Sequence, residues 1–185
     1  MNLTDAQSKF ILHWGEMGTR WGTNRTVAQI HALLYIAGRP INAEEIAATL
    51  NVARSNVSNS LRELQSWGIA SVTHKLGDRC DYFETNTDVW EIFRIIMDER
   101  KRREIDPTIR VLTECVNNLN DTKSKDPTDQ LTHDRLKELL SFIEFMSNWY
   151  DRMQKLPPKT LETMAKLGSK LESVIGSVSP KKKSS

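Results

Sequence analysis

The stretch from Asn42 to Glu84 constrains the fold of this chain more than any other. Apolar residues at helical spacing predict a short helix capped by Asn42 and, after a tight turn, a second helix from Arg54 to about Trp67. Gly68 suits the position just past a helix end. Alternating residues then predict two strands joined by a loop, at residues 69–73 and 80–85. The predicted order is therefore helix, turn, helix and hairpin.

This order is typical of a winged helix-turn-helix, whose second helix contacts DNA. Val57, Leu61 and Leu64 share one face of that helix and should anchor it to a core. The other faces carry small polar groups and arginines, which bond base edges or phosphates. The predicted DNA-binding residues are Arg54, Ser55, Asn56, Ser58, Asn59 and Arg62 of the helix, with Lys75 and Arg79 of the wing. An ordinary solvated helix face is the alternative, although Ser and Asn are poor helix formers.

Composition limits the class of protein. Of the 185 residues, 38% are hydrophobic and 27% are charged, as in soluble globular proteins. No apolar run approaches the roughly 18 residues of a membrane span, and the N-terminus lacks the features of a signal peptide. We therefore expect a cytoplasmic protein without a membrane partner. The net charge of +2 is small, which favours a site-specific DNA reader over a non-specific nucleic-acid coat.

No motif of an enzyme is present. The sequence lacks a nucleophile elbow, a glycine-rich phosphate loop and the usual spacings of metal ligands, so we expect no catalysis, no cofactor and no metal. Cys80 and Cys115 form no CxxC motif and are expected to be reduced and unpaired. Cys80 follows Arg79, and its thiol is either incidental or a redox sensor with a lowered pKa.

Further helices are predicted on both sides of this module. Helical periodicity predicts them at residues 5–19, 25–37, from near 88, from 106, at 132–155 and at 159–178, and residues 121–130 form a polar connector. The fold class is thus mainly α with a small β-wing (α+β), a winged helix-turn-helix with N- and C-terminal dimerisation helices.

The apolar seams of the flanking helices predict a homodimer. The expected parts are an N-terminal packing or dimerisation helix (1–22), the winged helix-turn-helix (23–86), a helical dimerisation and effector region (87–178) and a disordered basic tail (179–185). A dimer would place two reading helices roughly 34 Å apart on double-stranded DNA, which favours a palindromic operator.

Several segments resemble one family. GTNRT at 22–26, RSNVS at 54–58, GDRCDYFET at 77–85 and DVW at 88–90 resemble the GbsR branch of the MarR-type regulators. The resemblance implies a dimeric winged-helix transcription factor, usually a repressor, modulated by a small ligand. In this branch the known theme is control of osmoprotectant genes, with choline or glycine betaine as effectors. Ala53 departs from the pattern, since many MarR-type proteins have there a serine that caps the reading helix.

Aromatic residues offer a site for such an effector. Trp14, Trp21, Trp90 and Phe93 could hold a quaternary ammonium through cation–π contacts, but aromatic residues at helical spacing also pack in cores. A winged-helix module that binds proteins and no DNA is the alternative function. Such a module would show apolar anchors on the outward face of its second helix.

Overall fold

The structure is a computed structural model that describes residues 1–121 and 126–178. The chain forms two compact units, Met1–Glu99 and Arg100–Ser185. The tail predicted at 179–185 lies outside the described residues, as does part of the connector predicted at 121–130. The functional division at residues 22, 86 and 178 stays a prediction.

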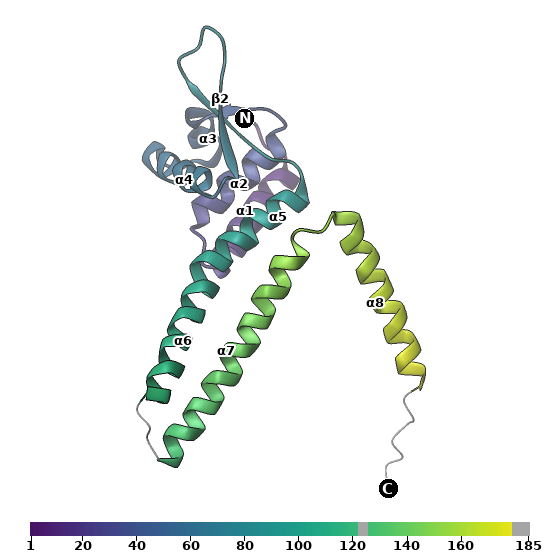
Figure 1. The fold of residues 1–185 in the computed structure, drawn as a ribbon. Helices are drawn as coiled ribbons and strands as arrows, with labels where there is room; N and C mark the ends of the chain where they lie inside the picture. Colours follow the sequence, from purple (N-terminus) through teal and green to yellow (C-terminus); the bar gives the residue numbers. More distant parts are fainter. Residues whose placement is uncertain (122–125, 179–185) are drawn as a thin grey trace. The chain divides into compact units, whose positions relative to one another are not determined.

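The first unit contains the predicted helix, turn, helix and hairpin (Figure 1). Its elements are α1 (Asp5–Arg20), α2 (Arg25–Ala37), β1 (Ile41–Asn42), α3 (Ala43–Leu50), α4 (Arg54–Ser66), β2 (Ala70–His74), β3 (Asp81–Thr85) and α5 (Val89–Arg100), which ends at the boundary. The mainly helical fold with a small antiparallel sheet confirms the predicted class.

Polar caps set the starts of these helices. Thr4 and Gln7 form a reciprocal capping box at α1, and the Asn24 side chain accepts a hydrogen bond of 2.8 Å from the backbone of Thr26 at α2. Asn42 accepts one of 2.8 Å from the backbone N–H of Glu45 at α3. Glu45 does not complete a capping box with Asn42, because its carboxylate pairs with the guanidinium of Arg39.

Helix α2 is the centre of the first unit. It packs against α1, α3, α4 and β3, and seven of its thirteen residues are buried. Ile30 and Leu33 are fully buried, and the same core includes Ile11 from α1 and Ile46 from α3. Because Ile11 belongs to this core, α1 is part of the compact unit that contains the helix-turn-helix.

Two glycines let α1 approach α2 closely. A Cβ atom at Gly18 would lie 2.5 Å from the Cβ of Ala28, and one at Gly15 would lie 2.7 Å from the Cγ of Gln29. Carbon atoms of real side chains do not come so close, so the contact between the two helices requires the missing side chains.

His31 lies within this core beside α1. Its side chain is 5% exposed, its Nε2 has no hydrogen-bond partner among the described residues, and its ring meets the edge of Trp14 at 6.1 Å between centroids. Burial lowers the pKa of His31 from 6.5 to about 4, because the charged imidazolium would lose its hydration. His31 is therefore a neutral core residue at pH 7.

The sheet has the strand order β1-β3-β2, and both pairings are antiparallel. Ile41 pairs with Phe83, so β1 adds a third strand to the hairpin. Phe83 also faces Val72 on β2 and is buried, so it joins the hairpin to the core. The hydroxyl of Thr85 donates a 2.7 Å hydrogen bond to the carbonyl of Ile69, which fixes the base of the hairpin.

Asp88 caps α5, which begins next to the residue 88 predicted for its start. Its carboxylate accepts hydrogen bonds from the backbone N–H groups of Trp90 at 2.9 Å and Glu91 at 3.3 Å. A carboxylate at this position also favours the positive end of the helix dipole.

The second unit contains a π-helical segment, η1 (Lys101–Ile105), followed by α6 (Asp106–Asp121), α7 (Pro127–Met153) and α8 (Pro158–Val178). Asp106, at the predicted start of a helix, does not act as an N-cap, since its φ of −61° and ψ of −40° are helical. Pro107 cannot donate a backbone hydrogen bond, and a wide π turn precedes it. The ammonium of Lys101 lies 3.2 Å from the carboxylate of Asp106 and 3.4 Å from that of Asp151.

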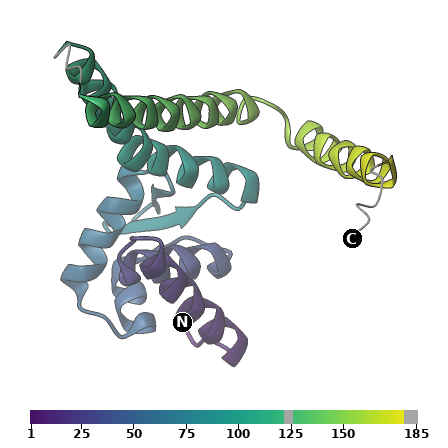
Figure 2. The same cartoon turned by 90° about the horizontal axis from the view of Figure 1, so that it is seen from below.

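Helices α6 and α7 run side by side as an antiparallel pair (Figures 1 and 2). Leu112 and Val116 of α6 are buried there, as the predicted seam requires. Helix α7 begins five residues earlier than predicted, at Pro127, because Asp126 caps it through the N–H of Thr128 at 2.8 Å. The predicted seam residues Leu171, Ile175 and Val178 of α8 lie outside the described side chains.

Among the residues that the structure describes, no helix combines the length and apolar character needed to cross a membrane.

Candidate nucleic-acid interface

The turn between α3 and α4 sets the direction of the second helix. Asn51 ends α3 in the left-handed region, with φ 52° and ψ 49°, which asparagine tolerates better than most residues. Ala53 occupies the N-cap of α4 and supplies no side-chain hydrogen bond. The N–H groups in the first turn of α4 therefore lack the usual cap.

One side of α4 is anchored as predicted. Val57, Leu61 and Leu64 are at most 2% exposed and belong to the core. Ser60 is also buried, which the sequence did not indicate. The helix is thus fixed along its length, so the side chains on its other faces have defined positions.

The remaining faces of α4 carry the predicted polar residues. Those that are exposed are Arg54, Ser55, Asn56, Asn59 and Arg62, and Ser58 is half-buried. A guanidinium N–H of Arg62 donates to the amide oxygen of Asn59, one turn earlier. Large apolar side chains do not occur on the exposed face of this helix. A protein-binding helix face would be expected to carry such anchors.

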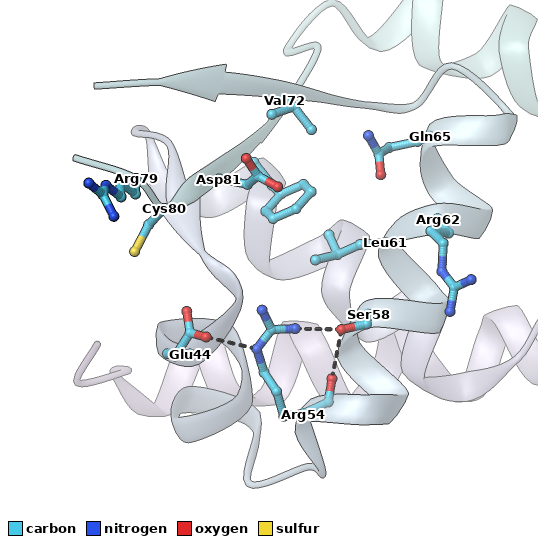
Figure 3. Close-up of a pocket in the computed structure, with 11 residues that line it drawn as sticks. Glu44, Arg54, Ser58, Leu61, Arg62, Gln65, Val72, Arg79, Cys80 and Asp81 are labelled. Atoms are coloured by element: carbon cyan, nitrogen blue, oxygen red, sulfur yellow. Dashed lines mark hydrogen bonds and ion pairs between the residues drawn. The ribbon is translucent and has the colours of Figure 1, made fainter. Parts of the chain in front are cut away.

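Arg54 is held at the start of α4 (Figure 3). Its Nε donates to a carboxylate oxygen of Glu44 at 3.0 Å, and its Nη1 donates to the hydroxyl of Ser58. That hydroxyl donates in turn to the carbonyl of Arg54 at 3.1 Å. The hydrogen bond from Arg54 holds the pKa of Glu44 below its usual value, so Glu44 is ionised at neutral pH.

A hollow of about 440 Å³ lies between α4 and the wing (Figure 3). It is lined by side chains of α3, α4 and the hairpin: Glu44, Arg54, Ser58, Leu61, Arg62, Gln65, Val72, Arg79, Cys80, Asp81 and Phe83. Three arginines and two carboxylates thus surround a floor that includes Leu61 and Phe83. The structure brings together Arg54, Ser58, Arg62 and Arg79 of the predicted set.

The wing tip has an ordered turn. Gly77 has a φ of +81°, and the N–H of Asp78 donates to the carbonyl of Lys75 at 3.0 Å. The Asp78 carboxylate accepts from the hydroxyl of Tyr82 at 2.7 Å, and the ammonium of Lys75 lies 3.8 Å from the centre of the Tyr82 ring. Lys75 is therefore held on the hairpin, whereas Arg79 lines the hollow.

The interpretation of Cys80 as a thiol with a lowered pKa is wrong. Cys80 is exposed, but a hydrogen bond to the Asp78 carboxylate and the negative charge of that group raise its pKa. A raised pKa reduces the thiolate fraction and with it the reactivity toward oxidants. Cys115 is half-buried and also unpaired.

The four aromatic candidates for effector binding have different environments. Trp14 is half-buried, packs against the core and contacts the rings of Phe10 and His31. Trp21 and Phe93 are each about half exposed, and Trp90 is half-buried. None of these four lines the hollow beside α4. For Trp14 the core alternative is correct at least in part, and the aromatic site stays a prediction.

Sequence reasoning missed Glu44, Gln65 and Asp81 as parts of this site. Of these three, Glu44 could most readily have been predicted from the sequence, because it lies in the first turn of one helix and Arg54 lies in the first turn of the next. In a helix-turn-helix these two turns are neighbours, and opposite charges there can pair. Within the described residues, no three His, Cys, Asp or Glu side chains cluster closely enough to hold a metal ion.

Comparison with known proteins agrees with this geometry. Residues 21–79 match the model of the MarR family. The Bacillus subtilis (strain 168) protein named "Putative HTH-type transcriptional regulator YvaV" is 19% identical over 155 residues, which cover 82% of this chain and 86% of that protein. The "HTH-type transcriptional repressor OpcR" of the same organism is 18% identical over 136 residues, or 74% of each chain.

The fold is also similar to that of a solved protein. A crystal structure of a transcriptional regulator is 19% identical and has a TM-score of 0.58, covering 80% of this chain and 95% of that one. The chain therefore has the winged helix-turn-helix fold, and its residues 21–79 are similar to the MarR family of transcriptional regulators.

Proposed function

We propose that the protein is a dimeric, sequence-specific DNA-binding repressor, whose helix α4 enters the major groove. One observation carries this proposal: α4 is anchored in the core by Leu61 and its neighbours, and it presents an arginine bonded to an asparagine on its outward face. Arginine bonds guanine and asparagine bonds adenine bidentately, and an anchored helix can hold them in register with base pairs.

The polar residues are assigned different parts in this complex. Ser55, Asn59 and Arg62 contact base edges, while Asn56 and Ser58 support them or bond phosphates. Arg54, at the N-terminus of the helix, contacts a phosphate, as does Arg79 of the wing. Lys75 contacts the backbone or the adjacent minor groove. The protein-binding alternative has less support, since the outward face of α4 lacks apolar anchors.

Replacing Arg62 with alanine should reduce discrimination between DNA sites. A duplex obtained by selection from a random pool is compared with a scrambled duplex of equal length by fluorescence anisotropy. The lost bidentate contact should cost about 1–3 kcal/mol on the selected duplex and little on the scrambled one. Arg79→Ala is the contrasting variant: it should weaken both complexes and flatten their salt dependence. Equal affinity of Arg62→Ala and wild type for the selected duplex would contradict the placement of α4.

The proposal also gives the protein the role of a repressor and places it in the GbsR branch. One relative bears the name of a transcriptional repressor, and the segments at 22–26, 54–58 and 77–85 resemble the GbsR branch. On that basis the regulated genes concern osmoprotectants, and the effector is choline or glycine betaine.

A homodimer on a palindromic site follows from the same proposal. Helix α7 carries exposed Phe142, Phe145, Met146 and Trp149 at helical spacing, a larger apolar face than a lone helix pair can cover. Analytical ultracentrifugation at micromolar concentration should give the mass of two chains, about twice 21.2 kDa. A single-chain mass at that concentration would remove the dimer and the palindrome with it.

The effector proposal is tested by tryptophan fluorescence. Choline or glycine betaine bound by cation–π contacts to Trp21, Trp90 or Phe93 should shift the emission in a saturable way. Trp21→Leu and Phe93→Leu should each weaken that response, while Trp67→Leu, which lies at the end of α4, should leave it unchanged. A flat titration, with isothermal calorimetry also flat, would show that this aromatic site binds neither compound.

A further inference from the structure

The first turns of α3 and α4 meet at one ion pair. Glu44 is 67% exposed and Arg54 is 49% exposed, and the carboxylate of Glu44 binds the Nε of Arg54 at 3.0 Å. The Nη1 of Arg54 is bound by the hydroxyl of Ser58 on the next turn of α4. Two of the three guanidinium nitrogens are thus occupied by neighbouring side chains.

The third nitrogen, Nη2, is left for a ligand. Within the described part of the chain, its N–H groups make no hydrogen bond to another residue. The guanidinium is held between Glu44 and Ser58 at the edge of the hollow (Figure 3). An arginine fixed in this way has already lost side-chain freedom that it would otherwise lose on binding DNA.

The charge of Glu44 has a second effect. Non-specific affinity for DNA rises with the number of phosphates that free cations neutralise. Arg54, Arg62 and Arg79 all line the hollow, and a carboxylate in contact with Arg54 reduces the attraction of this group for a phosphate at an arbitrary position. Only a phosphate that meets Nη2 in the right direction gains the hydrogen bonds of the fixed guanidinium.

We infer that Glu44 is a positioning residue for Arg54 and that it sets the ratio of specific to non-specific DNA binding. This inference rests on the proposed function, because it requires α4 to contact DNA. Glu44 does not itself contact bases. It acts by orienting the guanidinium of Arg54 and by offsetting its charge. Arg54 therefore contributes fully to the affinity for the specific DNA site and only weakly to the affinity for other sequences.

Glu44→Gln is the main test, since the amide can still accept the hydrogen bond from Arg54 but carries no charge. Asp81→Asn is the matched control: Asp81 lines the same hollow, but its carboxylate lies 3.2 Å from His74 and has no bond to Arg54. Each substitution is made in the wild type and in the Arg54→Ala variant. Binding to a selected and to a scrambled duplex is measured by fluorescence anisotropy over a range of salt concentrations.

Glu44→Gln should raise affinity for the scrambled duplex about fivefold and steepen its salt dependence by about one phosphate contact, while affinity for the selected duplex changes less than about twofold. The ratio of the affinity for the selected duplex to that for the scrambled duplex should therefore fall. In the Arg54→Ala background Glu44→Gln should no longer change the ratio. Asp81→Asn should act alike in both backgrounds. Glu44→Ala, which also releases Arg54, should lower affinity for the selected duplex.

Different results overturn different claims. If Glu44→Gln changes the ratio equally with and without Arg54, or no more than Asp81→Asn does, the inference about Glu44 is wrong while the DNA-binding face stands. If Arg54→Ala and Arg62→Ala both bind every duplex as the wild type does, the proposed interface fails, and the inference fails with it. Thermal unfolding of each variant separates these outcomes from loss of the fold.

Discussion

Replacing Leu61 with alanine is expected to lower the free energy of unfolding by about 2–5 kcal/mol, the usual range for a buried leucine whose removal leaves a cavity. Leu61 is 2% exposed and belongs to the core cluster formed by α2, α3, α4 and the hairpin. Chemical denaturation followed by circular dichroism measures the change.

A second leucine of the same unit provides the control. Leu76, at the tip of the wing, is fully exposed at 108%. Leu76→Ala should change stability by less than about 0.5 kcal/mol, as most surface substitutions do. Similar effects of the two substitutions would mean that α4 does not pack on the core through Leu61. Because Leu61 also lines the hollow, its loss should weaken binding to DNA in proportion to the loosening of α4.

The second large effect is a dependence of stability on pH that comes from His31. Burial lowers the pKa of His31 in the folded protein to about 4, from an ordinary value of 6.5. As the pH falls through this window, the unfolded chain takes up the proton first, so the free energy of unfolding decreases. The contribution of His31 to the free energy of unfolding is complete above about pH 6.5, and about 3 kcal/mol of this contribution is lost by pH 4.

Removing the imidazole tests this directly. Position 31 cannot titrate in His31→Phe and His31→Leu, so the stability of these variants should fall less between pH 6.5 and pH 4.5 than that of the wild type, whatever their stability at pH 7. Denaturation midpoints measured across this range give the slope. Hydrogen bonding lowers the pKa values of Glu44, Glu45 and Asp78, so these carboxylates also lose stabilisation as the pH falls toward their ordinary values. The wild type and the His31 variants share this contribution, so the difference between their slopes isolates His31. Equal slopes for the wild type and the variants would contradict a neutral buried His31.

Local sequence signals were sufficient for most of the first unit. Thr4, Asn24 and Asn42 are helix caps whose effect acts within three residues, and they start α1, α2 and α3 where predicted. The periodicity of Val57, Leu61 and Leu64 gave the buried side of α4 because a helix fixes which residues share a face.

The errors came from contacts between residues distant in sequence, or from signals with two interpretations. Asp106 before Pro107 is a common helix start, but here the helical backbone passes through it and a π turn accommodates the proline. Asp126 before Pro127 is the same signal, and there it does start a helix. Only the surrounding structure distinguishes the two.

The candidate site shows the same limit. The polar face of α4 is visible in its sequence, since all its members belong to one helix. The hollow is not, because it needs Glu44 from α3 and Asp81 from β3 next to α4. The raised pKa of Cys80 likewise depends on the turn that brings Asp78 to its thiol, whereas the sequence neighbour Arg79 suggested the opposite direction.

The contact between Gly18 and Ala28 restricts how this protein can evolve. Alanine is ordinarily the better helix former by about 1 kcal/mol, yet at residue 18 the added methyl group would occupy the space of the one at residue 28. Enlargement on one helix therefore demands a compensating reduction on the other. The side chains at residues 18 and 28 must fit into the same space. In homologous sequences we therefore expect these two positions to vary together, so that their combined side-chain volume does not increase.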